Sequence, residues 1–158
     1  MPDMRVGHGF DVHRFGGEPP LVLCGVVVSG DRGVESTSDG DVALHALIDA
    51  LLGAAALGDI GEMFPSSDPR WEGASSVELL RLAYSRVVEA GYTVGNIDIT
   101  IICQKVRIAP HRDVMRKKVA QVLSVDIGAV SVKATTTDGL GFIGLGEGLA
   151  VQAAVTLR

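Results

Sequence analysis

The chain has 158 residues, 47% of them hydrophobic but only 4% aromatic, and a formal net charge of −5 at pH 7. This length predicts one domain, residues 1–158, with an aliphatic core, and the negative charge argues against a nucleic-acid-binding or membrane-surface protein. The longest apolar stretch, residues 50–58, is too short to span a bilayer, and we see no signal peptide, so we expect a cytoplasmic protein.

The first predicted element is an extended segment that carries two metal-ligand side chains. Residues 5–10 contain two glycines, which would weaken a helix. Alternate side chains of a strand point the same way, so Asp11 and His13 can converge on one cation, whereas His8 lies out of phase with both. A surface turn with an incidental histidine is the alternative interpretation.

A second, largely buried strand is predicted over residues 21–28, after a loop over residues 16–20. Residues 29–39 are polar and predict a mobile surface loop of the kind that carries function. Cys24 and Cys103 both lie in apolar runs. We therefore expect buried free thiols in a reducing compartment.

A buried helix is predicted over residues 42–57, because the segment is apolar almost all round. Ser38 or Asp39 can cap its start. Its polar interior residues, His45 and Asp49, are four apart and share one face of the helix. Unpaired polar groups are costly in a buried position, so these two side chains need partners.

His45 is a candidate third metal ligand. Together with Asp11 and His13 it would give Zn²⁺ one carboxylate and two imidazoles, with a fourth position left open as in catalytic sites. Asp49 could then orient His45 from the next helical turn. A core histidine paired with Asp49, without metal, is an equally good interpretation of the spacing alone.

The remaining elements alternate between helices and strands. Ser75 and Glu78 predict a capping box for an amphipathic second helix that ends at Gly91. The other predicted elements are a strand over residues 97–103, a helix that begins at Pro110, a strand over residues 130–135, a glycine-rich loop and a last strand over residues 149–157. This order predicts an α/β (α+β) single domain, with a mixed β-sheet and helices packed on one face.

Residues 133–138 end a predicted strand in three threonines and an aspartate. Hydroxyls and free backbone N–H groups suit phosphate oxygens, and a carboxylate beside phosphate suits Mg²⁺. Lys105 and Arg107 follow another strand end and could also contact phosphate. The alternative is a threonine-rich strand end closed by an Asp turn.

Taken together, five stretches resemble the 2-C-methyl-D-erythritol 2,4-cyclodiphosphate synthase family. They are Arg5-Val-Gly-His-Gly-Phe-Asp-Val-His13, Ser38-Asp-Gly-Asp-Val-Ala-Leu-His45, Ala54-Ala-Ala-Leu-Gly-Asp-Ile-Gly61, Lys133-Ala-Thr-Thr-Thr-Asp138 and Gly146-Glu-Gly148. The resemblance implies a homotrimer with active sites between subunits. It also implies a reaction of the non-mevalonate isoprenoid pathway, in which the 2-phosphate of 4-diphosphocytidyl-2-C-methyl-D-erythritol 2-phosphate attacks the β-phosphorus, CMP leaves and a cyclic diphosphate closes.

The same resemblance implies the site residues. It places one Zn²⁺ per subunit on Asp11, His13 and His45, and Mg²⁺ or Mn²⁺ on Asp138 with the substrate. Thr136 and Thr37 fall on positions that stabilise the transition state. The implied substrate contacts are Asp11, His13, Thr37, Ser38, Asp59, Ile60, Gly61, Phe64, Pro65, Ser66, Ser67, Asp68, Cys103, Gln104, Lys105, Val106, Arg107, Ile108, Ala109, Thr135, Thr136, Thr137, Asp138 and Phe142.

Three residues depart from the family pattern. Thr37 stands where the family has a histidine, and it can donate a hydrogen bond but cannot carry positive charge. Ser66 replaces an aspartate in the substrate-binding turn. Leu145 replaces an arginine that in the family lines a central cavity able to hold an isoprenoid diphosphate, so we expect no such binding here.

Two other functions remain open at this point. The first is a non-catalytic, metal-stabilised trimeric binding module that kept the fold, which the threonine at position 37 would suit. The second is a zinc phosphohydrolase that uses water at the open metal position, although the sequence offers no evident general base.

Overall fold

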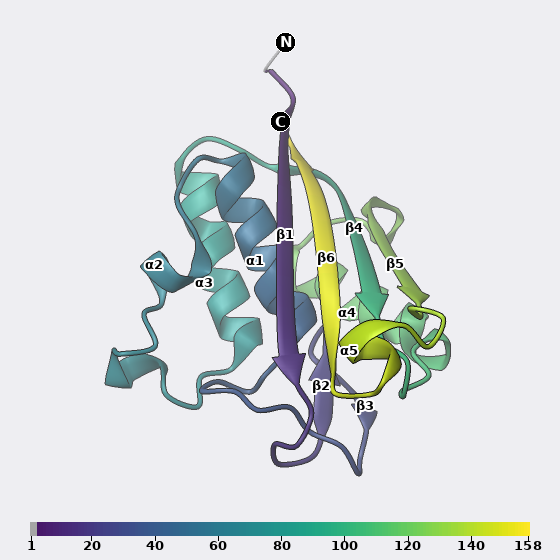
Figure 1. Cartoon of the computed structure of the whole chain (residues 1–158). Helices are drawn as coiled ribbons and strands as arrows, with labels where there is room; N and C mark the ends of the chain where they lie inside the picture. The colour runs from purple at the N-terminus through teal and green to yellow at the C-terminus, as the bar shows by residue number, and fades with distance from the viewer. Residues whose placement is uncertain (1–2) are drawn as a thin grey trace.

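The computed structural model describes residues 3–158, so residues 1 and 2 of the predicted domain lie outside it, and it contains a mixed sheet of four strands (Figure 1). The strands are β1 (Arg5–Arg14), β4 (Val94–Ile102), β5 (Val130–Thr135) and β6 (Gly148–Leu157). Their order across the sheet is β1-β6-β4-β5, and only the pair β4 and β5 is parallel. The predicted mixed sheet is confirmed.

The long helices gather on one face of this sheet (Figure 1). They are α1 (Val42–Ala54), α3 (Ser76–Glu89) and α4 (Arg112–Leu123), and the short ones are α2 (Ile60–Met63) and α5 (Gly141–Gly144). Helix α1 packs on β1 and β6, α3 packs on α1, and α4 packs beside β5. Within the described residues, no helix is long and apolar enough to cross a membrane.

The opposite face of the sheet carries exposed apolar side chains. On β1, the exposed fractions of Val6, Phe10 and Val12 are 66%, 51% and 37%. Gly7 and Gly9, which point to the other side of the strand, are buried against the helices. The period of two along β1 therefore separates a helix-facing side from a bare apolar side.

Strand β1 and helix α1 are in backbone contact because of two glycines. A Cβ atom on Gly9 would lie only 1.8 Å from the carbonyl oxygen of Ala46, and one on Gly7 would lie 1.9 Å from that of Ala50. Any side chain at these positions would push the strand away from the helix. The close approach brings the next two helix-facing residues of β1, Asp11 and His13, up to the start of α1.

The predicted strand over residues 21–28 is wrong, because this segment forms a hairpin of β2 (Leu21–Leu23) and β3 (Val26–Ser29) outside the main sheet. Cys24 and Gly25 form the turn, with φ values of 53° and 71°. Their N–H groups donate to the carboxylate of Asp41 at 2.9 and 2.7 Å. The apolar residues on both sides of the turn resemble one continuous strand. The carboxylate that stabilises the turn belongs to Asp41, outside this segment, so the local sequence does not show it.

The same carboxylate caps α1, so the prediction of Ser38 or Asp39 as the cap is wrong. Asp41 is fully buried and accepts from the N–H of Leu44 at 3.0 Å. Burial raises its pKa to about 6, against the opposing effect of the N–H donors. Asp41 thus ties the β2–β3 hairpin to the helix that carries His45.

Helix α3 also begins differently from the prediction. Ser75 occupies the N-cap position but makes no side-chain cap bond. The carboxylate of Asp39 accepts from the N–H of Ser76 at 2.8 Å instead. Both cysteines are buried free thiols, as expected.

Candidate metal centre and substrate pocket

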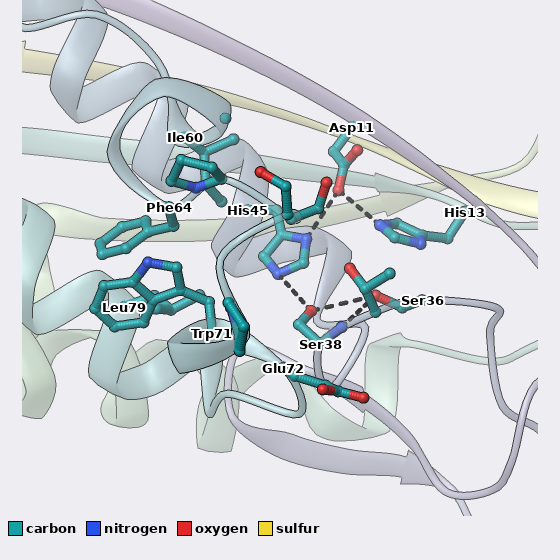
Figure 2. Close-up of a pocket in the computed structure, with 16 residues that line it drawn as sticks. Asp11, His13, Ser36, Ser38, His45, Ile60, Phe64, Trp71, Glu72 and Leu79 are labelled. Atoms are coloured by element: carbon teal, nitrogen blue, oxygen red, sulfur yellow. Dashed lines mark hydrogen bonds and ion pairs between the residues drawn. The ribbon is translucent and has the colours of Figure 1, made fainter.

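Asp11, His13 and His45 converge as predicted (Figure 2). Asp11 Oδ2 lies 3.0 Å from His13 Nε2 and 3.2 Å from His45 Nδ1, although His45 is 34 residues away from Asp11 in sequence. The three ligand atoms lie within 4.8 Å of one another. One carboxylate oxygen and two imidazole nitrogens at this spacing fit a cation such as Zn²⁺, with room for a fourth ligand.

The charges of the group also suit a cation. Burial alone would raise the pKa of Asp11, but hydrogen bonds with His13 and His45 outweigh it and lower the pKa to about 2. The hydrogen bond with Asp11 in turn raises the pKa of His13, against burial. The centre therefore holds a carboxylate that is already ionised.

His13 is oriented by the backbone of the loop that follows β3. Its Nδ1 lies 2.8 Å from the carbonyl oxygen of Glu35, which can only accept. The ring therefore carries a proton on Nδ1 and presents Nε2 toward Asp11. This arrangement of a backbone carbonyl behind a ligand histidine is common at metal sites.

Asp49 does not orient His45, so that prediction is wrong. Its Oδ1 accepts from the N–H of Ile60 at 2.8 Å and so fixes the start of α2. The far nitrogen of His45, Nε2, instead lies 2.9 Å from Ser76 Oγ and 3.2 Å from Ser38 Oγ. The spacing of four residues correctly placed His45 and Asp49 on one face of the helix, but the two side chains do not hydrogen-bond each other.

A pocket of about 970 Å³ opens over the metal centre (Figure 2). Of the predicted contacts, those that line it are Asp11, His13, Thr37, Ser38, Ile60, Gly61, Phe64, Pro65, Ser66 and Ser67. The sequence reasoning missed Ser36, Pro69, Trp71, Glu72 and Leu79. Trp71 packs edge-on against Phe64, with ring centroids 4.9 Å apart. The one feature of the sequence that could have indicated a role for Trp71 is that it is the single tryptophan of the chain.

Two predicted substrate contacts between residues 59 and 68, Asp59 and Asp68, lie beside the pocket but do not line it. Asp59 caps α2 by accepting from the N–H of Glu62 at 2.8 Å. Asp68 pairs with Arg70 at 2.6 Å, and this hydrogen bond lowers the pKa of Asp68. Both carboxylates hold the turn in shape.

The remaining predicted residues form a second group at the β5 edge of the sheet, beside α5 and away from α2 (Figure 1). This group consists of residues 103–109, residues 135–138 and Phe142. Gln104 Oε1 accepts from the N–H of Gly139 at 3.2 Å, and Thr136 Oγ1 accepts from the N–H of Asp138 at 3.2 Å. The chain brings these residues together, but not to the metal centre.

Comparison with other proteins shows a close relationship over the whole chain. The chain is 56% identical over 155 residues to a Klebsiella pneumoniae subsp. pneumoniae protein named 2-C-methyl-D-erythritol 2,4-cyclodiphosphate synthase, and the match covers 98% of both chains. A Vibrio vulnificus protein of the same name is also 56% identical, again over 98% of both chains.

Solved structures also match over nearly the whole chain. The bifunctional IspDF from Campylobacter jejuni superposes with a TM-score of 0.96 at 46% identity, over 98% of this chain and 42% of the bifunctional one. A CDP complex of IspF from Plasmodium falciparum gives a TM-score of 0.84 at 33% identity, over 98% and 95% of the two chains. The sequence model of the YgbB family matches residues 4–158, and this chain belongs to that family.

Proposed function

We propose that this protein is a 2-C-methyl-D-erythritol 2,4-cyclodiphosphate synthase, a phosphorus–oxygen lyase of the non-mevalonate isoprenoid pathway. It converts 4-diphosphocytidyl-2-C-methyl-D-erythritol 2-phosphate to the 2,4-cyclodiphosphate and releases CMP. The observation that carries the proposal is the group Asp11, His13 and His45 at the floor of a 970 Å³ pocket. It occurs in a chain 56% identical to relatives of that name.

The metal ligands divide between the two groups of residues. Asp11, His13 and His45 would hold one Zn²⁺ per subunit, and Asp138 would hold Mg²⁺ or Mn²⁺ with the substrate. Bound there, the two metals supply charge neutralisation for the reacting phosphates. Thr136, at the end of β5, offers a hydroxyl donor to the same phosphates.

The pocket walls position the rest of the substrate. Ile60, Phe64, Trp71 and Leu79 give one side an apolar wall suited to the carbon skeleton. Hydroxyls of Ser36, Thr37, Ser38, Ser66 and Ser67 can hydrogen-bond phosphate and erythritol oxygens. The attacking 2-phosphate is already anionic, so the reaction needs positioning rather than a general base.

A complete site requires a second subunit in this proposal. None of the residues lining the metal pocket in the described chain is a lysine or arginine. Lys105 and Arg107 are exposed at the β5 edge, with residues 135–138. A homotrimer that buries the bare apolar face of β1 would bring the β5 edge of one subunit to the metal pocket of the next.

Phosphorus NMR of the purified protein with the diphosphocytidyl substrate, zinc and Mg²⁺ tests this function. We expect CMP and a cyclic diphosphate to appear together, and protein treated with a chelator to form neither. A zinc-loaded trimer without turnover would support the non-catalytic binding module. CMP without a cyclic product would support the phosphohydrolase.

A further inference from the structure

A buried serine lies behind the metal ligand His45. Ser76 is fully buried, and Asp41, His45 and Ser76 are the buried polar side chains of residues 3–158. Ser76 Oγ lies 2.9 Å from His45 Nε2, and it also hydrogen-bonds Asp39 Oδ1. Ser76 therefore bridges a histidine and a carboxylate.

The single proton of the Ser76 hydroxyl decides the direction of both bonds. An ionised carboxylate can only accept, so the hydroxyl donates to Asp39. The oxygen of Ser76 is then free to accept, and the donor it meets is Nε2–H of His45. An imidazole whose Nδ1 binds a metal carries its proton on Nε2, so this direction is the one that a metal-bound His45 requires.

The position of Asp39 keeps it an acceptor. Its Oδ2 accepts from the N–H of Ser76 at 2.8 Å, and its Oδ1 accepts from the N–H of Asp41 at 3.2 Å. The carboxylate thus lies at the N-terminus of α3, a helix of 14 residues, where negative charge is favoured. Two backbone donors and the helix fix it against Ser76.

We propose that Asp39 and Ser76 are positioning residues that hold the proton of His45 on Nε2 and leave Nδ1 free to bind the metal. The inference rests on the proposed function, because it takes the metal centre to be zinc. His45 Nδ1 lies 3.2 Å from Asp11 Oδ2 and can donate to it when no metal is bound. A metal between the two atoms would replace that proton, and Nε2 would then carry the one proton of the ring. The pair Asp39–Ser76 does for His45 what the Glu35 carbonyl does for His13.

Ser38 offers His45 a second, weaker contact. Its Oγ lies 3.2 Å from Nε2, accepts from the N–H of Gly40 at 3.2 Å and faces Ser36 Oγ at 3.2 Å. Ser38 is also less buried than Ser76 and has no carboxylate behind it. We therefore assign the orientation of His45 to Ser76.

Zinc affinity tests the serine. Ser76→Ala removes the acceptor from Nε2–H, and we expect zinc to bind about 10- to 100-fold more weakly in competition with a chromophoric chelator. Ser75→Ala is the matched control, because Ser75 precedes Ser76 at the start of the same helix and makes no side-chain cap bond. Equal zinc affinities for the two variants, both folded by circular dichroism, would overturn the inference.

The tautomer of His45 tests the pair directly, without zinc. Two-bond proton–nitrogen NMR spectra, recorded well above the usual histidine pKa of about 6.5, report which ring nitrogen carries the proton. Without a metal, Asp11 can itself accept from His45 Nδ1, so the measurement uses the Asp11→Ala background. In that background we expect the His45 proton on Nε2. Adding Asp39→Ala removes the acceptor of the Ser76 hydroxyl. The hydroxyl can then donate to Nε2, and we expect the form of His45 with its proton on Nδ1 to appear.

The outcomes separate this inference from the proposed function. A His45 with its proton on Nδ1 in the Asp11→Ala protein, or an Asp11→Ala/Asp39→Ala protein that keeps it wholly on Nε2, would refute the inference even if the wild type binds zinc. A wild type that binds no zinc would refute the metal centre of the proposed function, and the NMR result would still decide the role of Ser76. If Ser76→Ala fails to fold, the Asp11→Ala spectrum alone can contradict the proposal.

Discussion

The two groups of predicted site residues differ in how the chain holds them. At the metal centre, each ligand is hydrogen-bonded to another side chain or to a backbone carbonyl, and His45 is buried. At the β5 edge, Thr135, Thr136 and Asp138 are exposed, as are Lys105 and Arg107. The first group is held by hydrogen bonds and has no lysine or arginine in its pocket, whereas the second is exposed and carries both. In the proposed function they are two parts of one site, which we call the rigid half and the open half.

This difference indicates what each half contributes. A metal centre requires ligands held within tenths of an ångström, and β1 and α1 supply this by backbone contact at Gly7 and Gly9. Residues on exposed strand ends can adjust, as the proposed function requires when the substrate and a neighbouring subunit arrive. In that proposal the two groups complement each other only across a subunit interface, which the following experiments test.

The largest expected effect comes from removing a metal ligand. His45→Gln should lower turnover about 1,000-fold, or about 4 kcal/mol of transition-state stabilisation, because no lysine or arginine lines the pocket in the described residues to replace the charge of a lost metal. Phosphorus NMR and zinc content measured on the same sample would check it. His111→Gln is the control, since His111 lies beyond β4 and does not line the pocket. Equal losses in both variants would contradict a metal role specific to His45.

Mixing two inactive variants would show whether the halves meet across subunits. His45→Gln damages the metal half, and Asp138→Asn damages the other half. In trimers formed at equal ratio, about a quarter of the interfaces combine an intact metal half with an intact Asp138, so about a quarter of the wild-type rate should return. The measurement is turnover after the two variants are unfolded and refolded together.

The control for this mixture pairs two lesions in the same half. His45→Gln refolded with Asp11→Asn leaves no subunit with an intact metal centre, and the rate should remain at background. If the first mixture also remains at background although mass spectrometry shows mixed trimers, each site lies within one chain.

The backbone contact beneath the metal centre should account for much of the rigidity of that half. In Gly9→Ala, the new Cβ meets the Ala46 carbonyl oxygen at 1.8 Å, so we expect a loss of about 3 kcal/mol in the free energy of unfolding by urea. Gly53→Ala, on the exposed side of α1 with no atom within 4 Å, should instead stabilise the protein by about 0.5–1 kcal/mol. Equal stabilities for the two variants would show that β1 can move away from α1 without cost.

The rigid half was the easier one to predict from the sequence. The period of two along residues 5–14 placed Asp11 and His13 on one face, and the apolar helix placed His45 inside. What the sequence did not show were the partners, because Ser76 lies 31 residues from His45 and 37 from Asp39. The spacing along the helix instead favoured Asp49, rather than Ser76, as the partner of His45.

The prediction of a single strand over residues 21–28 was wrong for a related reason. Apolar residues on both sides of Cys24 resemble one buried strand, and the acceptor that stabilises the turn, Asp41, lies 17 residues farther along. Asp41 also caps α1, in place of the predicted Ser38 or Asp39. Patterns within one element were predictable, whereas hydrogen bonds between elements required the structure.

The smallest effect concerns Thr37, which lines the metal pocket where the family resemblance expects a histidine. A threonine hydroxyl donates a neutral hydrogen bond, whereas an imidazolium donates a charged one, and the difference is about 1.4 kcal/mol for a phosphate oxygen. Thr37→His should therefore raise turnover about 10-fold, most clearly below the usual histidine pKa of about 6.5. Thr37→Gln, long but neutral, should give no such gain. Thr37 is exposed, so either side chain fits without repacking the core. Equal rates for the wild type and Thr37→His would mean that the open half of the neighbouring subunit already supplies the positive charge that this pocket lacks.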